Sequence, residues 1–129
     1  MLKAQTVFSG LSVDDLTKAK EFYTQILGLT LDKETMGLQF QLPHGGSLFI
    51  YDKPDHLPAT FTVLNFIVVS IDDAVDELVM HGVTFEKYDN MPSQQDAKGI
   101  LRGIAANQGP DIAWFKDPAG NILSVLQES

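Results

Sequence analysis

The sequence predicts an α+β protein made of two similar modules, each with the element order β-α-β-β-β. Three observations predict this class. A strand-like apolar run is followed twice by an amphipathic helix pattern, further strand-length runs follow each helix, and short segments of the two halves match in the same order. Repeats in a fixed order are the signature of a duplicated unit. We therefore expect a single domain at 1–129, with a first module at 1–53, a linker at 54–60 and a second module at 61–129.

The first module is expected to begin with a strand at Thr6–Val13, followed by a helix over residues 15–27. Asp14 and Asp15 offer side-chain oxygens that can cap the helix start. Gly28 can adopt the positive φ that commonly ends a helix. Three further strands are expected at Leu29–Leu31, Gly37–Leu42 and Ser47–Tyr51.

The second module repeats this order. Ser70 or Asp72 is expected to cap its helix, and Gly82 to end it. Residues Asp89–Arg102 are polar and are interpreted as a long excursion between strands. The turn-forming residues 117–121 predict an antiparallel hairpin between two apolar runs. The expected strands are Phe61–Val69, Val83–Lys87, Ile112–Phe115 and Ile122–Leu126.

The internal repeat predicts a cleft. The helix segment Leu16–Ala19 matches Ile71–Ala74, and the turn at residues 43–45 matches residues 118–120. Each module would place its helix on one face of its sheet and leave the other face free. Two such sheets curving around a shared space would form a cupped cleft, which is where small molecules bind in many proteins.

Composition and charge narrow the function classes. The chain has 129 residues, a formal net charge of −8 and no cysteine. An acidic chain with scattered basic residues is a poor partner for nucleic acid or an anionic membrane surface. The lack of cysteine excludes disulfides, thiolate zinc sites and a cysteine nucleophile. No apolar run is long enough to span a membrane, so we expect a cytoplasmic protein.

Two motifs carry a family resemblance. V-D-D-L-T-K-A-K-E-F-Y-T-Q-I-L-G-L at residues 13–29 and F-K-D-P-A-G-N at residues 115–121 resemble the vicinal oxygen chelate superfamily. This group contains glyoxalases, bleomycin resistance proteins and extradiol dioxygenases. The resemblance implies their fold of paired β-α-β-β-β modules, and it implies a homodimer. It leaves the activity open, because this fold hosts isomerases, dioxygenases, thiol transferases and binding proteins.

The resemblance also implies a divalent metal, held by His, Glu or Gln at strand positions that face the cleft. At the corresponding positions this sequence offers mostly hydrocarbon side chains and a lone hydroxyl. Such groups are poor ligands for a divalent ion, so we expect no metal and no other cofactor. His44, His56 and His81 are expected to be exposed loop or helix-end residues. The corresponding metal positions in this sequence are Phe8, Phe49 or Tyr51, Val63 and Ser124.

The predicted cleft residues are aromatic rings with a few polar groups, which suits a small, partly apolar organic ligand. Two alternatives stay open. One is a metal-dependent lyase, dioxygenase or transferase of glyoxalase type with a relocated metal site. The other is a structural or partner-binding domain whose cleft is filled by its own side chains. The candidate ligand-binding residues are Phe8, Ser12, Phe40, Phe49, Tyr51, Asn65, Arg102, Trp114 and Ser124.

Overall fold

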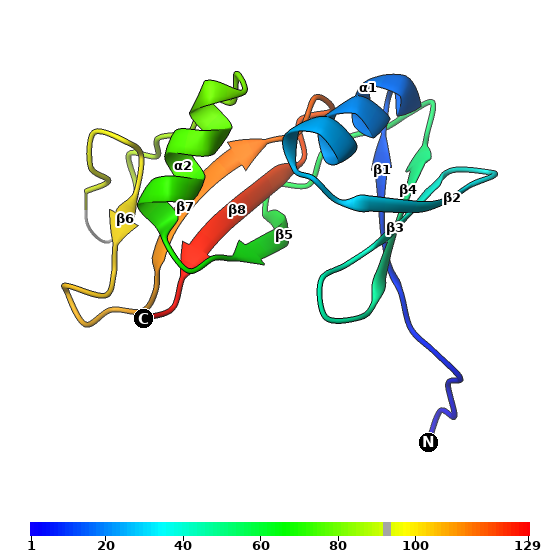
Figure 1. The fold of residues 1–129 in the computed structure, drawn as a ribbon, viewed down its shortest axis with the longest axis horizontal. Coiled ribbons are helices and arrows are strands. Elements are labelled where there is room, and N and C mark those ends of the chain that lie inside the picture. Colours follow the sequence, from blue (N-terminus) through cyan, green and yellow to red (C-terminus); the bar gives the residue numbers. More distant parts are fainter. Residues whose placement is uncertain (92–93) are drawn as a thin grey trace. The chain divides into compact units, whose positions relative to one another are not determined.

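The computed structural model describes residues 1–91 and 94–129, and it divides into two compact units, Met1–Pro58 and Ala59–Ser129 (Figure 1). The division falls within the predicted linker at 54–60. Each unit contains one four-stranded sheet and a helix. The predicted α+β class with two repeated modules is confirmed. None of the helices in the described residues is both long and apolar enough to cross a membrane.

The first unit has the strand order β1-β4-β3-β2, in which β1 and β4 are parallel and the other pairs antiparallel. Its helix starts as predicted, because the Asp15 carboxylate accepts a hydrogen bond from the Lys18 backbone N–H at 3.1 Å. The helix then widens into a π-helical turn before Gly28, whose φ of 72° ends it. The elements are β1 (Ser9–Val13), α1 (Leu16–Glu21), η1 (Phe22–Ile26), β2 (Thr30–Glu34), β3 (Leu38–Gln41) and β4 (Ser47–Asp52).

The core of the first unit lies between the helix and one face of the sheet. Alternate strand residues point to this face, because side chains alternate along a strand. Tyr23 is fully buried and its ring lies 5.8 Å from that of Phe40. Phe40 pairs in register with Leu48, which is also buried. The prediction that Phe40 contacts a ligand is therefore wrong: its ring belongs to the helix-facing core.

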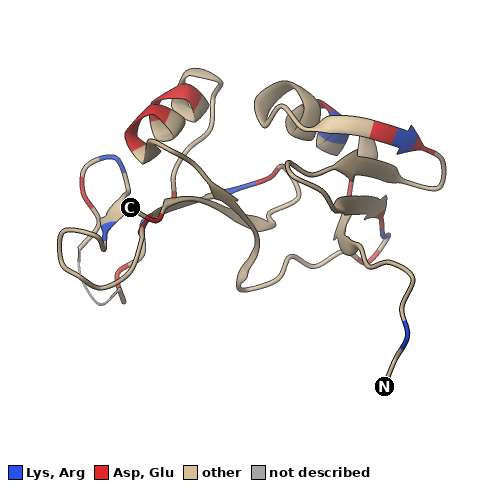
Figure 2. Cartoon of the chain, turned by 60° about the horizontal axis from the view of Figure 1, so that its bottom comes forward, with Lys and Arg blue, Asp and Glu red and all other residues tan. Residues whose placement is uncertain are grey.

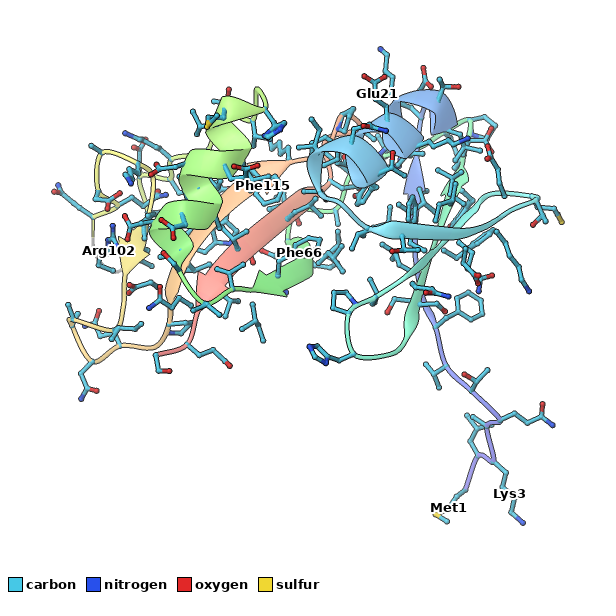
Figure 3. All side chains as sticks on the ribbon, in the orientation of Figure 1. Met1, Lys3, Glu21, Phe66, Arg102 and Phe115 are labelled. Carbon is cyan, nitrogen blue, oxygen red and sulfur yellow. The ribbon has the colours of Figure 1, made fainter. Side chains whose placement is uncertain are left out.

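The second unit has the strand order β5-β8-β7-β6, with β5 and β8 parallel. Of the two predicted caps, Ser70 is the one used: its hydroxyl accepts a hydrogen bond from the Asp73 backbone N–H at 3.2 Å. The core is apolar and includes Phe115, which is fully buried and lies between α2 and the sheet (Figure 3). The elements are β5 (Thr62–Ile67), α2 (Ile71–Met80), β6 (Leu101–Arg102), β7 (Asp111–Lys116) and β8 (Ile122–Gln127).

The fourth strand of this sheet is split in two. The predicted strand Val83–Lys87 makes a single β-bridge, between Phe85 and Phe115, and one further hydrogen bond to β7 from the Glu86 N–H. Farther along the chain, β6 pairs with the other end of β7. The strand is shorter than predicted because the chain leaves the sheet after Glu86 and returns only at β6.

One side chain fastens the excursion between the two pieces. The Gln95 amide donates to the carbonyls of Glu86 at 3.0 Å and Gly99 at 2.6 Å, and its oxygen accepts from the Tyr88 N–H at 2.7 Å. Both ends of the excursion are thereby tied to the same glutamine. Pro92 and Ser93 of the predicted excursion lie outside the described residues.

The β7–β8 hairpin is present where the sequence predicts it, and a buried carboxylate organises its turn. One oxygen of Asp117 accepts hydrogen bonds from the backbone N–H groups of Ala119 and Asn121, each at 2.9 Å. Its other oxygen accepts from the Asn121 side-chain amide, also at 2.9 Å. Both side chains are buried, so the turn is held by groups that water does not reach.

Candidate functional site

Three aromatic rings lie on the face of the first sheet that points away from its helix. Leu11 and Ile50, which pair in register, point into the core, so their strand neighbours point the opposite way. The ring of Phe49 is edge-on to that of Phe8, with centroids 6.3 Å apart, and stacked on that of Tyr51 at 6.0 Å. We call Phe8, Phe49 and Tyr51 the aromatic ladder. Phe8 is 62% exposed, so an apolar ring of this ladder is left open.

A glycine makes room for the middle ring of the ladder. A Cβ atom on Gly37 would lie 2.7 Å from the Cζ atom of Phe49 and 2.6 Å from the carbonyl oxygen of Ile50. Any side chain at Gly37 would therefore displace the ring or the strand that carries it. The local sequence carries no signal for this role of Gly37, because the contact joins residues that are distant along the chain.

A polar pair lies at the end of β1. The hydroxyl of Ser12, whose residue pairs in register with Tyr51, is 2.7 Å from Nδ1 of His56. The backbone supports this contact, because the Lys53 N–H donates to the Val13 carbonyl and the His56 N–H to that of Lys53. The prediction of an exposed loop residue is wrong for His56, which is partly buried and bonded to β1.

The corresponding face of the second sheet carries an amide, a hydroxyl and two rings. Ser124 pairs in register with both Asn65 and Trp114. Its hydroxyl is fully buried and donates to Oδ1 of Asn65 at 2.5 Å. The Tyr88 ring is edge-on to Trp114, with centroids 5.6 Å apart. The structure therefore brings together three predicted site residues of this unit and adds Tyr88.

Tyr88 could not have been predicted from its local sequence, because the excursion brings it beside Trp114. Burial, and secondarily the negative charge of Glu86, raise the pKa of the Tyr88 phenol above its usual value of 10.0. The phenol is therefore neutral at physiological pH. It can donate a hydrogen bond while its ring offers an apolar surface.

Arg102 is committed to carboxylates on the helix side of the second unit (Figure 3). Its guanidinium donates two hydrogen bonds to Asp72 at 2.8 and 3.0 Å and one to Asp96 at 3.0 Å. Asp111 lies 3.7 Å away. Arg102 was predicted to contact a ligand. Its guanidinium instead joins the start of α2, through Asp72, to the excursion, through Asp96.

The pairing of Arg102 gives a pH-dependent prediction. Hydrogen bonds from Arg102, and then from Lys98, lower the pKa of Asp72 to about 2 from 3.8. Because the folded-state pKa is the lower one, ionised Asp72 stabilises the fold above about pH 4, and this stabilisation is lost as the pH falls toward 2. Arg102→Gln should raise the Asp72 pKa, measured by carboxyl-carbon NMR, and lower the melting temperature at pH 7.

The effect of the same substitution on stability should shrink as the pH falls through 2, because Asp72 then becomes protonated in both proteins. Lys33→Gln removes an exposed cation from the first unit and serves as the matched control. An unchanged Asp72 pKa in the Arg102→Gln protein would show that this pairing does not form in solution.

The side chains at the expected metal positions do not fit a divalent cation. Phe8, Phe49 and Val63 carry no donor atom, and the Ser124 hydroxyl is bonded to Asn65. Tyr51 alone would add one phenol, which is a poor ligand set for such an ion. Within residues 1–91 and 94–129, no three His, Cys, Asp or Glu side chains gather closely enough to hold a metal.

The fold recurs among solved structures. A fosfomycin resistance protein from Listeria monocytogenes matches with a TM-score of 0.68 and 17% identity, covering 99% of this chain and 96% of that one. An antibiotic-binding protein from a Streptomyces species matches at 0.64 and 24%, covering 99% and 100%. A lactoylglutathione lyase from Agrobacterium tumefaciens matches at 0.64 and 18%, covering 96% and 94%. At these identities the likeness shows the fold.

Family membership comes from the sequence itself. A search of curated proteins found no match. The profile of the Glyoxalase/Bleomycin resistance protein/Dioxygenase superfamily, in contrast, matches residues 5–125, which is nearly the whole chain and includes both motifs that carried the resemblance. The chain therefore belongs to the glyoxalase/bleomycin resistance protein/dioxygenase superfamily.

Proposed function

We propose that this chain binds a small organic molecule with an aromatic ring, without a metal ion. The observation that carries the proposal is the aromatic ladder, whose rings are stacked and edge-on to one another and remain accessible to solvent. Aromatic side chains on an open sheet face provide flat apolar area, and stacking on them adds to the free energy gained by burial. A flat ligand would continue the stack.

The second unit supports the same class of ligand. Trp114 and Tyr88 form an edge-on pair, and the Asn65 amide lies on the same sheet face and is exposed. An apolar surface with a few polar groups is the usual composition of small-molecule sites. The Streptomyces protein of similar fold is an antibiotic-binding protein, and an antibiotic with a flat ring is therefore a candidate ligand for this chain.

The metal-free part of the proposal is supported by the donor chemistry. At the positions where family enzymes hold their metal, this chain offers rings, a valine and a hydroxyl.

We also propose a homodimer in the cytoplasm. Phe61, Ile67 and Val69, in and beside the edge strand β5, are large exposed apolar residues that a second copy could cover. Sedimentation of a monomer alone at micromolar concentration would contradict the dimer.

The binding proposal is tested through the lone tryptophan, Trp114. Fluorescence is followed while naphthol, quinoline and anthraquinone derivatives are titrated into protein kept in chelator. We expect saturable quenching by at least one compound whose ring lies close to Trp114, and binding at the ladder is followed by calorimetry. Failure of every compound to saturate, checked by calorimetry for sites that Trp114 does not sense, would overturn the proposal.

A further inference from the structure

A groove of about 620 Å³ lies on the helix side of the second unit. It runs between the second half of α2 and the segments at residues 83–87 and 97–98. Its floor includes Phe85, whose ring packs 5.5 Å from Phe115 in the core between α2 and the sheet. Trp114 points to the opposite face of this sheet, so the groove is separate from the surface proposed above.

The groove follows from the split fourth strand. Because the chain leaves the sheet after Glu86, no continuous strand covers the flank of α2 there. Two apolar helix residues consequently stay open: Val79 is 53% and Met80 80% exposed. With Val83 and Phe85 they form a continuous apolar lining. Apolar area that a helix leaves open within a hollow favours an apolar occupant.

The charges around the groove leave one cation without a partner. Carboxylates are frequent along α2 (Figure 2). The one in the lining, Asp76, pairs with Lys98 at 3.0 Å, and Lys98 also pairs with Asp72 at 3.2 Å. Glu86, next to Lys87 in the chain, pairs with Lys116 at 3.2 Å. In the part of the chain that the structure describes, no carboxylate lies within ion-pair distance of Lys87.

We propose that this groove binds a small amphipathic carboxylate, such as a medium-chain or aromatic carboxylic acid. The apolar body would lie on Val79, Met80 and Phe85, and the carboxylate would meet the ammonium group of Lys87. The volume falls within the range of about 300–1,000 Å³ that ligand pockets occupy. A neutral apolar molecule would leave Lys87 without a partner, and a cation would be repelled by it.

The test uses octanoate, octanol and octylammonium as probes of one chain length and three charges. The methionines are labelled with ¹³C in the methyl group, and the Met80 signal reports on the groove. We expect saturable shifts of Met80 with octanoate, weaker binding of octanol and the weakest of octylammonium. Met36, an exposed methionine of the first unit, should not shift and is the internal control.

Lys87→Gln should weaken octanoate binding by about tenfold and leave octanol binding unchanged, because a charge-assisted contact is lost. Val79→Gln should weaken both, and Lys33→Gln neither. Equal binding of the three probes, or no saturation of Met80, would overturn the inference. Because Trp114 fluorescence reports the other face, failure here is distinguishable from failure of the proposed ring-binding surface.

Discussion

Asp117→Ala is expected to lower the free energy of unfolding by about 3 kcal/mol, as buried hydrogen bonds to a carboxylate are lost and their donors remain. The substitution leaves the N–H groups of Ala119 and Asn121, and the buried Asn121 amide, without the acceptor that Asp117 provides. Burying an unpaired polar group costs more than the hydrogen bond itself contributes. Chemical denaturation at pH 7 measures the change.

Two variants sharpen this result. Asp117→Asn keeps one acceptor oxygen but turns a second donor toward the Asn121 amide, so an intermediate loss is expected. Asp52→Ala removes an exposed carboxylate at the end of β4 and should change stability by well under about 1 kcal/mol. Equal stabilities for Asp117→Ala and Asp52→Ala would mean that the buried network does not hold the hairpin.

Phe49→Ala should weaken binding of an aromatic ligand by about thirtyfold, the effect of truncating a central contact residue. Phe49 is the only ring of the ladder that contacts both others. Its loss removes one stacking surface and separates Phe8 from Tyr51. Calorimetric titration with an aromatic ligand, itself identified by calorimetry, measures the effect, and unfolding experiments confirm that the variant remains folded.

Phe22→Ala is the matched control, because Phe22 is also a partly exposed phenylalanine of the first unit but lies on the helical segment η1, outside the ladder. Its affinity should equal that of the unmodified protein. Gly37→Ala should reproduce part of the Phe49→Ala defect, since the added methyl group would displace the Phe49 ring. Equal affinities for Phe49→Ala and Phe22→Ala would remove the ladder from the binding surface.

Much of the fold could be predicted because its signals are local. Ser70 and Asp15 cap helices where their oxygens meet nearby N–H groups, and Gly28 ends a helix through its positive φ. The hairpin turn at 117–121 was visible for the same reason. Strand alternation predicted that Phe8, Ser12, Phe49 and Tyr51 share the sheet face that points away from the helix. The register of β1 with β4 agrees with this prediction.

The misplaced residues depend on contacts between distant segments. Phe40 lies one residue from an outward-facing neighbour, so its face is fixed only by the register with β4. Arg102 pairs with Asp72 of α2 and Asp96 of the excursion, and no local sequence pattern predicts this pairing. Tyr88 reaches Trp114, and His56 reaches Ser12, through irregular segments that carry no periodic signal.

The metal content of the purified protein decides between metal-free binding and a metal-dependent enzyme. Protein is stripped with chelator, offered manganese, iron, cobalt, nickel and zinc in turn, desalted and analysed for each element. Metal-free binding predicts no stoichiometric ion, and it predicts ligand binding that is the same before and after metal is offered. A tightly held stoichiometric ion that ligand binding requires would contradict it, and would favour a metal-dependent enzyme of glyoxalase type.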